Sequence, residues 1–142
     1  MKRDTTSGLK FEEKIKINKE GINVSKHALY RYLKSKNINY LDYISKKLLP
    51  DEAYINEIDS TLYIYEKKFQ KVNGSVDEKL QTAPFKILQY TKLANALNLK
   101  NVEFTYILSN FFKSPKYKDT FDYLDTFKNC HYYFEDEVNA IK

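Results

Sequence analysis

The order of predicted secondary-structure elements indicates an α/β domain with a central mixed β-sheet flanked by helices. Three observations support this fold class. Apolar residues in the first third of the chain recur at helical spacing, residues 53–72 are rich in tyrosine, isoleucine and phenylalanine, and the remainder alternates between helical and strand patterns. Because 142 residues suffice for one such unit, we expect residues 1–142 to form a single domain.

The first third of the chain is expected to be helical. A helix over residues 8–19 carries Phe11 and Ile15 four positions apart, and a second helix is expected over residues 25–36. The inward stripe of this second helix should consist of Ala28, Leu29, Tyr32 and Leu33. A shorter helix should follow and hold Leu41, Ile44, Leu48 and Leu49. Residues 22–49 therefore form an extra N-terminal helical segment beside the expected sheet.

Strand patterns begin after Pro50. We expect short strands over residues 53–58 and 61–72, joined by a hairpin-like turn at residues 57–60. The Asn-Gly pair at residues 73–74 ends the second strand. Ser75 then begins a helical turn as a capping box, in which the serine and the glutamate three residues later satisfy each other's free amides.

The second half alternates between helix and strand. Thr82 is expected to cap a longer helix with Pro84 in its first turn. Its inward face should carry Ile87, Leu88, Ala94 and Leu97. Residues 102–112 are expected to form a central strand, residues 117–128 a helix and residues 130–134 a final strand.

Composition narrows the classes of function. The net charge of +5 and the pI near 9.0 permit a polyanionic partner. A single cysteine, Cys130, with only His27 and His131 beside it, excludes an intrachain disulfide and a zinc site of ordinary spacing. The chain lacks a signal-like apolar core and any run of about 18 apolar residues, so we expect a soluble cytoplasmic protein without a membrane partner. It also lacks a glycine-rich phosphate loop, so no nucleotide cofactor is expected.

One strand changes character along its length. Because side chains alternate between faces, Leu62, Ile64, Glu66, Lys68 and Gln70 are expected to share one face. This face begins apolar and ends with an acid, a base and an amide. Such a strand leaves the core and enters a cleft.

A second acid precedes the neighbouring strand. Asp51 follows Pro50, and it can meet Glu66 if their strands are neighbours. Two carboxylates of this kind suit Mg²⁺, or alternatively Mn²⁺, which keep several waters and also take phosphate oxygens. Lys68 beside them can orient a water or stabilise the charge that develops on phosphorus.

These residues resemble a known family. Pro50-Asp51 followed by Glu66-Lys67-Lys68 looks like the motif of the PD-(D/E)XK nuclease superfamily. Residues 69–82 are similar to a pattern of type II restriction-endonuclease-like members, and residues 8–12 (GLKFE) look like the first helix of the family. The resemblance covers roughly residues 8–112.

The resemblance implies a restriction-endonuclease-like fold and a metal-dependent DNA endonuclease. Asp51 and Glu66 would bind the metal, and Lys68 would serve the attacking water. Glu12 would add a carboxylate from the first helix, and Gln70 would support the site or contact DNA.

Alternatives remain for several of these residues. Glu66 and Lys68 can instead belong to a solvent-facing strand edge with alternating charge. Glu52 and Asp59 compete with Asp51 as the second acid, and Glu13 competes with Glu12 on the helix.

The expected partner is double-stranded DNA. Lys79 and Ser75 lie at a predicted helix start that suits a phosphate, and Lys26 and Arg31 lie on a basic helix that either contacts DNA or only packs on the domain. A symmetric homodimer would supply two sites for cutting both strands. The remaining hypotheses are a structure-selective nuclease, such as a junction resolvase or repair nicking enzyme, and a non-catalytic DNA-binding module.

Overall fold

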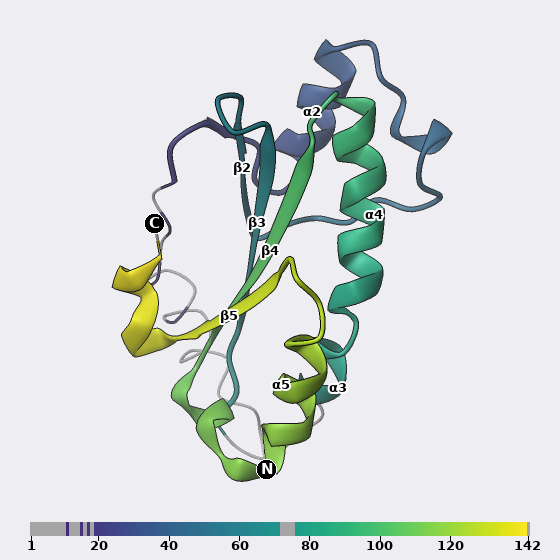
Figure 1. Ribbon diagram of the computed structural model, residues 1–142. Coiled ribbons are helices and arrows are strands. Elements are labelled where there is room, and N and C mark those ends of the chain that lie inside the picture. The colour runs from purple at the N-terminus through teal and green to yellow at the C-terminus, as the bar shows by residue number, and fades with distance from the viewer. Residues whose placement is uncertain (1–10, 12–14, 16, 18, 72–75, 142) are drawn as a thin grey trace.

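A five-stranded sheet forms the centre of the protein (Figure 1). The computed structural model describes residues 11, 15, 17, 19–71 and 76–141. In it the strands lie side by side in chain order, as β1 (Ile22–Asn23), β2 (Glu52–Asn56), β3 (Thr61–Lys68), β4 (Asn101–Leu108) and β5 (Cys130–Phe134). The first two pairings are antiparallel and the last two are parallel. The expected α/β class with a mixed sheet is confirmed, whereas the restriction-endonuclease-like topology stays a prediction.

In the described part of the chain, four α-helices accompany the sheet: α2 (Ala28–Ser35), α3 (Val76–Leu80), α4 (Ala83–Ala96) and α5 (Lys118–Leu124). Helix α4 runs along one face of the sheet, on the same side as α2 and α5 (Figure 1). The connection from β3 to β4 passes through α4, which allows the two strands to be parallel. Short 3-10 helices lie at Tyr40–Asp42, Asn110–Lys113, Pro115–Tyr117 and Glu135–Ala140.

Strand alternation divides the apolar residues between two clusters. On the helical face, Ile64 and Phe104 pack in one core with Tyr90 of α4 and Leu33 of α2. The opposite face carries a smaller cluster made of Phe11, Ile15, Ile17, Tyr54, Tyr65 and Ile107. Side chains of both faces are therefore buried along β3 and β4, the two strands with the most hydrophobic patterns.

Several predicted boundaries differ from the structure. The strands expected at residues 61–72 and 102–112 are shorter, because β3 and β4 both end where their parallel pairing ends, at Lys68 and Leu108. The strand expected at residues 53–58 is β2, which ends at Asn56 because the turn begins at residue 57. The strand expected at residues 130–134 and the turn at residues 57–60 are confirmed. The two-residue strand β1 was not expected from the pattern.

Some predicted inward positions are wrong. Leu88 is 54% exposed, because the buried stripe of α4 runs through Ala83, Ile87, Tyr90 and Ala94. Tyr30 rather than Tyr32 is buried on α2.

The third helix expected in the N-terminal segment is largely absent. Only Tyr40–Asp42 forms a helical turn there, and Leu41 and Leu49 are exposed whereas Ile44 is buried. The Asn-Gly pair, the capping box at Ser75 and most of the helix expected at residues 8–19 lie outside the described residues. No helix in the described part of the chain is long and apolar enough to cross a membrane.

Candidate functional site

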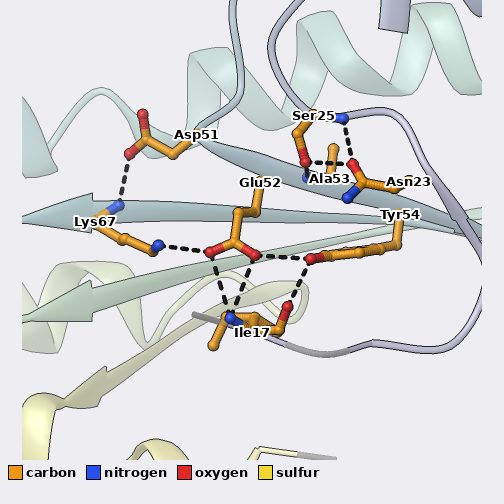
Figure 2. Close-up of polar contacts among 8 residues, drawn as sticks. All are labelled: Ile17, Asn23, Ser25, Asp51, Glu52, Ala53, Tyr54 and Lys67. Carbon is orange, nitrogen blue, oxygen red and sulfur yellow. Dashed lines mark hydrogen bonds and ion pairs between the residues drawn. The ribbon is translucent and has the colours of Figure 1, made fainter. Parts of the chain in front are cut away.

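Asp51 is placed by the short segment that leads into β2. Pro50 before it is buried, and the carbonyl oxygen of Pro50 accepts a hydrogen bond of 2.8 Å from the backbone N–H of Lys26. One carboxylate oxygen of Asp51 accepts a hydrogen bond of 2.8 Å from the backbone N–H of Lys67 (Figure 2). This bond holds the carboxylate of Asp51 over β3.

Glu66 lies on the helical face of β3, opposite Tyr106 of β4, and is only 6% exposed. Its side chain forms a hydrogen bond with that of Asp51, so the structure brings these two acids together as their spacing predicted. The pKa of Glu66 is raised from 4.5 to about 7, mainly by burial and next by the negative charge of Asp51. Two neighbouring carboxyl groups, one of them buried, favour the binding of a cation or a proton.

Lys68 is half-buried on the same face of β3, two residues further on. Its positive charge acts on Glu66 and lowers the pKa of that carboxyl, against the larger effects of burial and Asp51. The predicted trio of Asp51, Glu66 and Lys68 therefore lies in one place. Their roles as metal ligands and catalytic lysine stay predictions.

Lys86, in the first turns of α4, is a member of this cluster that sequence reasoning missed. It is half-buried, and burial lowers its pKa, an effect that the charges of Glu66 and Asp51 oppose. A signal was present: position 86 lies next to the buried stripe through Ala83, Ile87 and Tyr90, where a lysine is unusual. The site therefore has two acids and two lysines, on the sheet and on the helix that covers it.

Tyr90, one turn after Lys86, was also missed. Its side chain is fully buried, and its hydroxyl has no hydrogen-bond partner among the described residues. Burial raises the pKa of this tyrosine, and the negative charges of Glu66 and Asp51 raise it further. A neutral donor without a partner thus lies within electrostatic reach of both acids.

Gln70 does not continue the alternation of β3, because the strand ends at Lys68. Its backbone N–H donates to the hydroxyl of Ser109 at 3.1 Å, and this hydroxyl donates to the carbonyl oxygen of Gln70 at 2.9 Å. The side chain is only 5% exposed, and neither of its amide atoms has a partner in the described part of the chain. The predicted catalytic role of Gln70 stays a prediction.

The other predicted residues are distributed as follows. Glu12, with its alternative Glu13, and Ser75 lie outside the described residues. Lys79 is exposed on α3, and its charge acts on Lys86, so it borders the cluster. Lys26 and Arg31 are exposed in the N-terminal helical segment.

Glu52 competed with Asp51 in the sequence, and the structure places it on the opposite face of the sheet (Figure 2). There it forms an ion pair of 2.6 Å with Lys67 and accepts hydrogen bonds from the backbone N–H of Ile17 at 3.2 and 3.3 Å. The hydroxyl of Tyr54 lies 2.7 Å from the same carboxylate. These contacts give Glu52 a structural role away from Glu66.

Asp59, the other competitor, lies in the turn between β2 and β3 and accepts a hydrogen bond from the hydroxyl of Tyr63. It precedes Glu66 by seven positions, which is roughly 23 Å along a strand. It therefore does not share a site with Glu66.

The donor set of the cluster fits Mg²⁺ or Mn²⁺ better than zinc. Asp51 and Glu66 supply hard carboxylate oxygens, and Mg²⁺ commonly binds proteins through one or two carboxylates with water and phosphate oxygens completing its shell. Among the described residues no group of three or more His, Cys, Asp or Glu side chains is arranged for a metal ion, as a structural zinc site would require.

Known proteins give no further information on this cluster. No protein-family model, curated protein or solved structure matches the chain.

Proposed function

We propose that this protein is a Mg²⁺-dependent DNA endonuclease that hydrolyses phosphodiester bonds. Its catalytic site would consist of Asp51, Glu66, Lys68 and Lys86. The observation that carries the proposal is the meeting of two carboxyl groups, one of them nearly buried with a pKa raised to about 7, beside two lysines. Perturbed acids grouped with bases at the end of a strand are typical of catalytic sites.

The charges of the cluster suit a phosphodiester substrate. Asp51 and Glu66 would hold the divalent cation, which when bound stabilises negative charge developing on the phosphate oxygens. Lys68 and Lys86 supply positive charge to the phosphate from the sheet and from the helix. Lys68, on the strand beside Glu66, would also hydrogen-bond the attacking water and orient it toward the phosphorus.

Type II restriction-like cleavage is the form of the reaction that we propose, with a symmetric homodimer placing two sites on opposite DNA strands. Incubation of plasmid DNA and of four-way junctions with the protein and Mg²⁺ distinguishes the alternatives. Discrete fragments support a restriction activity, cleavage of junctions alone supports a structure-selective nuclease, and binding without cleavage supports a DNA-binding module.

Substitutions at the acids test the site itself. We expect Asp51→Asn and Glu66→Gln to lower the rate of plasmid cleavage by about 10²-fold or more, because each removes charge that acts in the transition state. Glu103→Gln is the matched control, since Glu103 pairs with His131 at 2.6 Å on the opposite face. Wild-type rates in both Asp51→Asn and Glu66→Gln would overturn the proposal.

A further inference from the structure

The positive charge of the chain is concentrated in one stretch. Residues 25–49, here called the basic segment, contain a single acid, Asp42. Their six basic residues are Lys26, Arg31, Lys34, Lys36, Lys46 and Lys47. The basic segment thus has a net charge of +5, equal to that of the whole chain, and the remaining residues contain eighteen bases and eighteen acids. A codon bias toward lysine would not confine the excess to 25 consecutive residues.

These six cations are displayed to solvent. All six residues are exposed, and none of them takes part in an ion pair recorded between described residues. Lys36 lies over the ring of Tyr32, and Lys47 lies over the rings of Tyr30 and Tyr40. Like charges gathered in one folded segment repel each other, and an anionic partner would relieve that repulsion.

The basic segment is nevertheless a folded part of the domain. Leu29 and Leu33 of α2 belong to the main core. The hydroxyl of Tyr30 donates to the carbonyl oxygen of Leu48 at 2.7 Å and accepts from its N–H at 2.8 Å, which ties the two ends of the segment together. The backbone that carries these cations is therefore fixed in the fold.

The start of the basic segment adjoins the candidate site. The N–H of Lys26 donates to the carbonyl oxygen of Pro50 at 2.8 Å, and the N–H of Ala53 donates to the hydroxyl of Ser25 at 3.0 Å (Figure 2 shows the second bond). Both bonds bracket Asp51. Helix α2 of the basic segment lies on the same side of the sheet as α4, and this is the side on which Asp51 meets Glu66 (Figure 1).

We propose that the basic segment is the surface that binds the phosphate backbone of duplex DNA and delivers one strand to the acids. The delivery of a strand to the acids rests on the proposed nuclease function, whereas the binding of DNA can be measured separately. Flexible lysines directed at phosphates give sequence-independent affinity that falls steeply with salt, because counterions are released from the DNA.

Charge neutralisation at matched positions tests the inference. Binding of a fluorescent 20-base-pair duplex is measured by anisotropy in EDTA over a series of salt concentrations. The test variant is Arg31→Gln/Lys34→Gln/Lys46→Gln, which avoids the lysines that lie over tyrosine rings. The control variant, Lys92→Gln/Lys100→Gln/Lys128→Gln, removes the same charge at exposed positions outside the segment.

We expect the test variant to lose about 10²-fold in affinity at 0.1 M salt and to lower the salt slope by about two to three, since each lost phosphate contact contributes about 0.9 to that slope. The control should stay within about threefold of the wild type. The charge-preserving variant Arg31→Lys/Lys34→Arg/Lys46→Arg should keep the wild-type slope, and thermal melting verifies that each variant is folded.

Equal losses in the test and control variants, or no binding by the wild type, would overturn the inference. Because the assay contains no Mg²⁺, its result is independent of cleavage. Segment-dependent binding by a protein that never cuts DNA would contradict the nuclease proposal alone. If the test variant cleaves DNA and its DNA binding keeps the wild-type salt slope, the proposed binding surface alone would be contradicted.

Discussion

The two faces of the sheet at β2 and β3 present the same residue types in opposite arrangements. On one face, Glu52 and Lys67 form a close ion pair, with side chains 14% and 7% exposed, and the backbone of Ile17 donates to the same carboxylate. On the other face, Asp51 and Glu66 bring two like charges together, and Lys68 and Lys86 only partly offset them. Because side chains alternate between faces, the neighbours Asp51 and Glu52 lie on opposite faces of the sheet, and so do Glu66 and Lys67.

A structural acid and a candidate catalytic acid differ in the groups that surround the carboxylate. Glu52 has every sign of a satisfied group: an opposite charge, two backbone hydrogen-bond contacts and a tyrosine hydroxyl. Glu66 is more deeply buried than Glu52 and faces another acid, so burial and the negative charge of Asp51 together disfavour its ionised form in the folded protein. We expect substitutions on the first face to affect stability and substitutions on the second to affect activity.

The largest effect is expected at the buried ion pair. Glu52→Ala should lower the free energy of unfolding by about 3–5 kcal/mol, because it removes the carboxylate that Lys67 and the N–H of Ile17 face in a nearly dry environment. Urea denaturation at pH 7 measures this. Glu103→Ala, at the more exposed pair with His131, should cost about 1 kcal/mol or less. Similar costs for the two variants would contradict the assigned role of Glu52.

The next effect concerns pH and Glu66. A carboxyl whose pKa is about 7 in the folded state and 4.5 ordinarily destabilises the folded protein as pH rises from 4.5 to 7, because the unfolded chain releases the proton first. Glu66→Gln removes this penalty. Without divalent metal, Glu66→Gln should therefore equal the wild type in stability near pH 4.5 and exceed it by about 3 kcal/mol above pH 7.

Urea denaturation of both proteins in EDTA, at intervals between pH 4.5 and 8, measures that difference. A gap that stays constant across this range would show that Glu66 does not titrate within it. Addition of Mg²⁺ at pH 8 should narrow the gap, since a cation held by Asp51 and Glu66 stabilises only the wild type.

Much of this arrangement could be predicted from the sequence, because it depends on local rules. The spacing from Pro50-Asp51 to Glu66, with a turn between two short strands, is enough to place Asp51 directly before one strand and Glu66 on its neighbour. Alternation along β3 then separates Glu66 from Lys67. The face shared by Glu66 and Lys68 follows from the same rule.

The remainder depends on tertiary packing, which single-sequence patterns do not contain. Lys86 joins the site only because α4 packs across β3, and its neighbour Leu88 is exposed for the same reason. The structural role of Glu52 requires Ile17, 35 residues away. The end of β3 at Lys68 reflects the end of pairing with β4, although the residues after it still favour a strand.

A smaller effect is expected from Lys86, which brings positive charge to the site from the helix rather than from the sheet. Lys86→Ala should lower the rate of DNA cleavage by about 10²-fold, because it removes one of the two cations near the phosphate. Since Lys86 lowers the pKa of Glu66, its loss should also move the acidic limb of the pH–rate profile to higher pH. Lys92→Ala, at an exposed position on the same helix, should leave both the rate and the profile unchanged.

The smallest effect is expected from Tyr90, whose buried hydroxyl lacks a partner among the described residues. Tyr90→Phe keeps the ring that packs in the core and removes only an unsatisfied polar atom, so stability in EDTA should rise by about 1 kcal/mol or less. If the hydroxyl instead donates to substrate or to water at the two acids, the same variant should lose cleavage activity without losing stability. Thermal melting and cleavage rates, measured together, distinguish a tyrosine that only packs in the core from one that positions substrate or water. A Tyr90→Phe protein that is markedly less stable would contradict both interpretations.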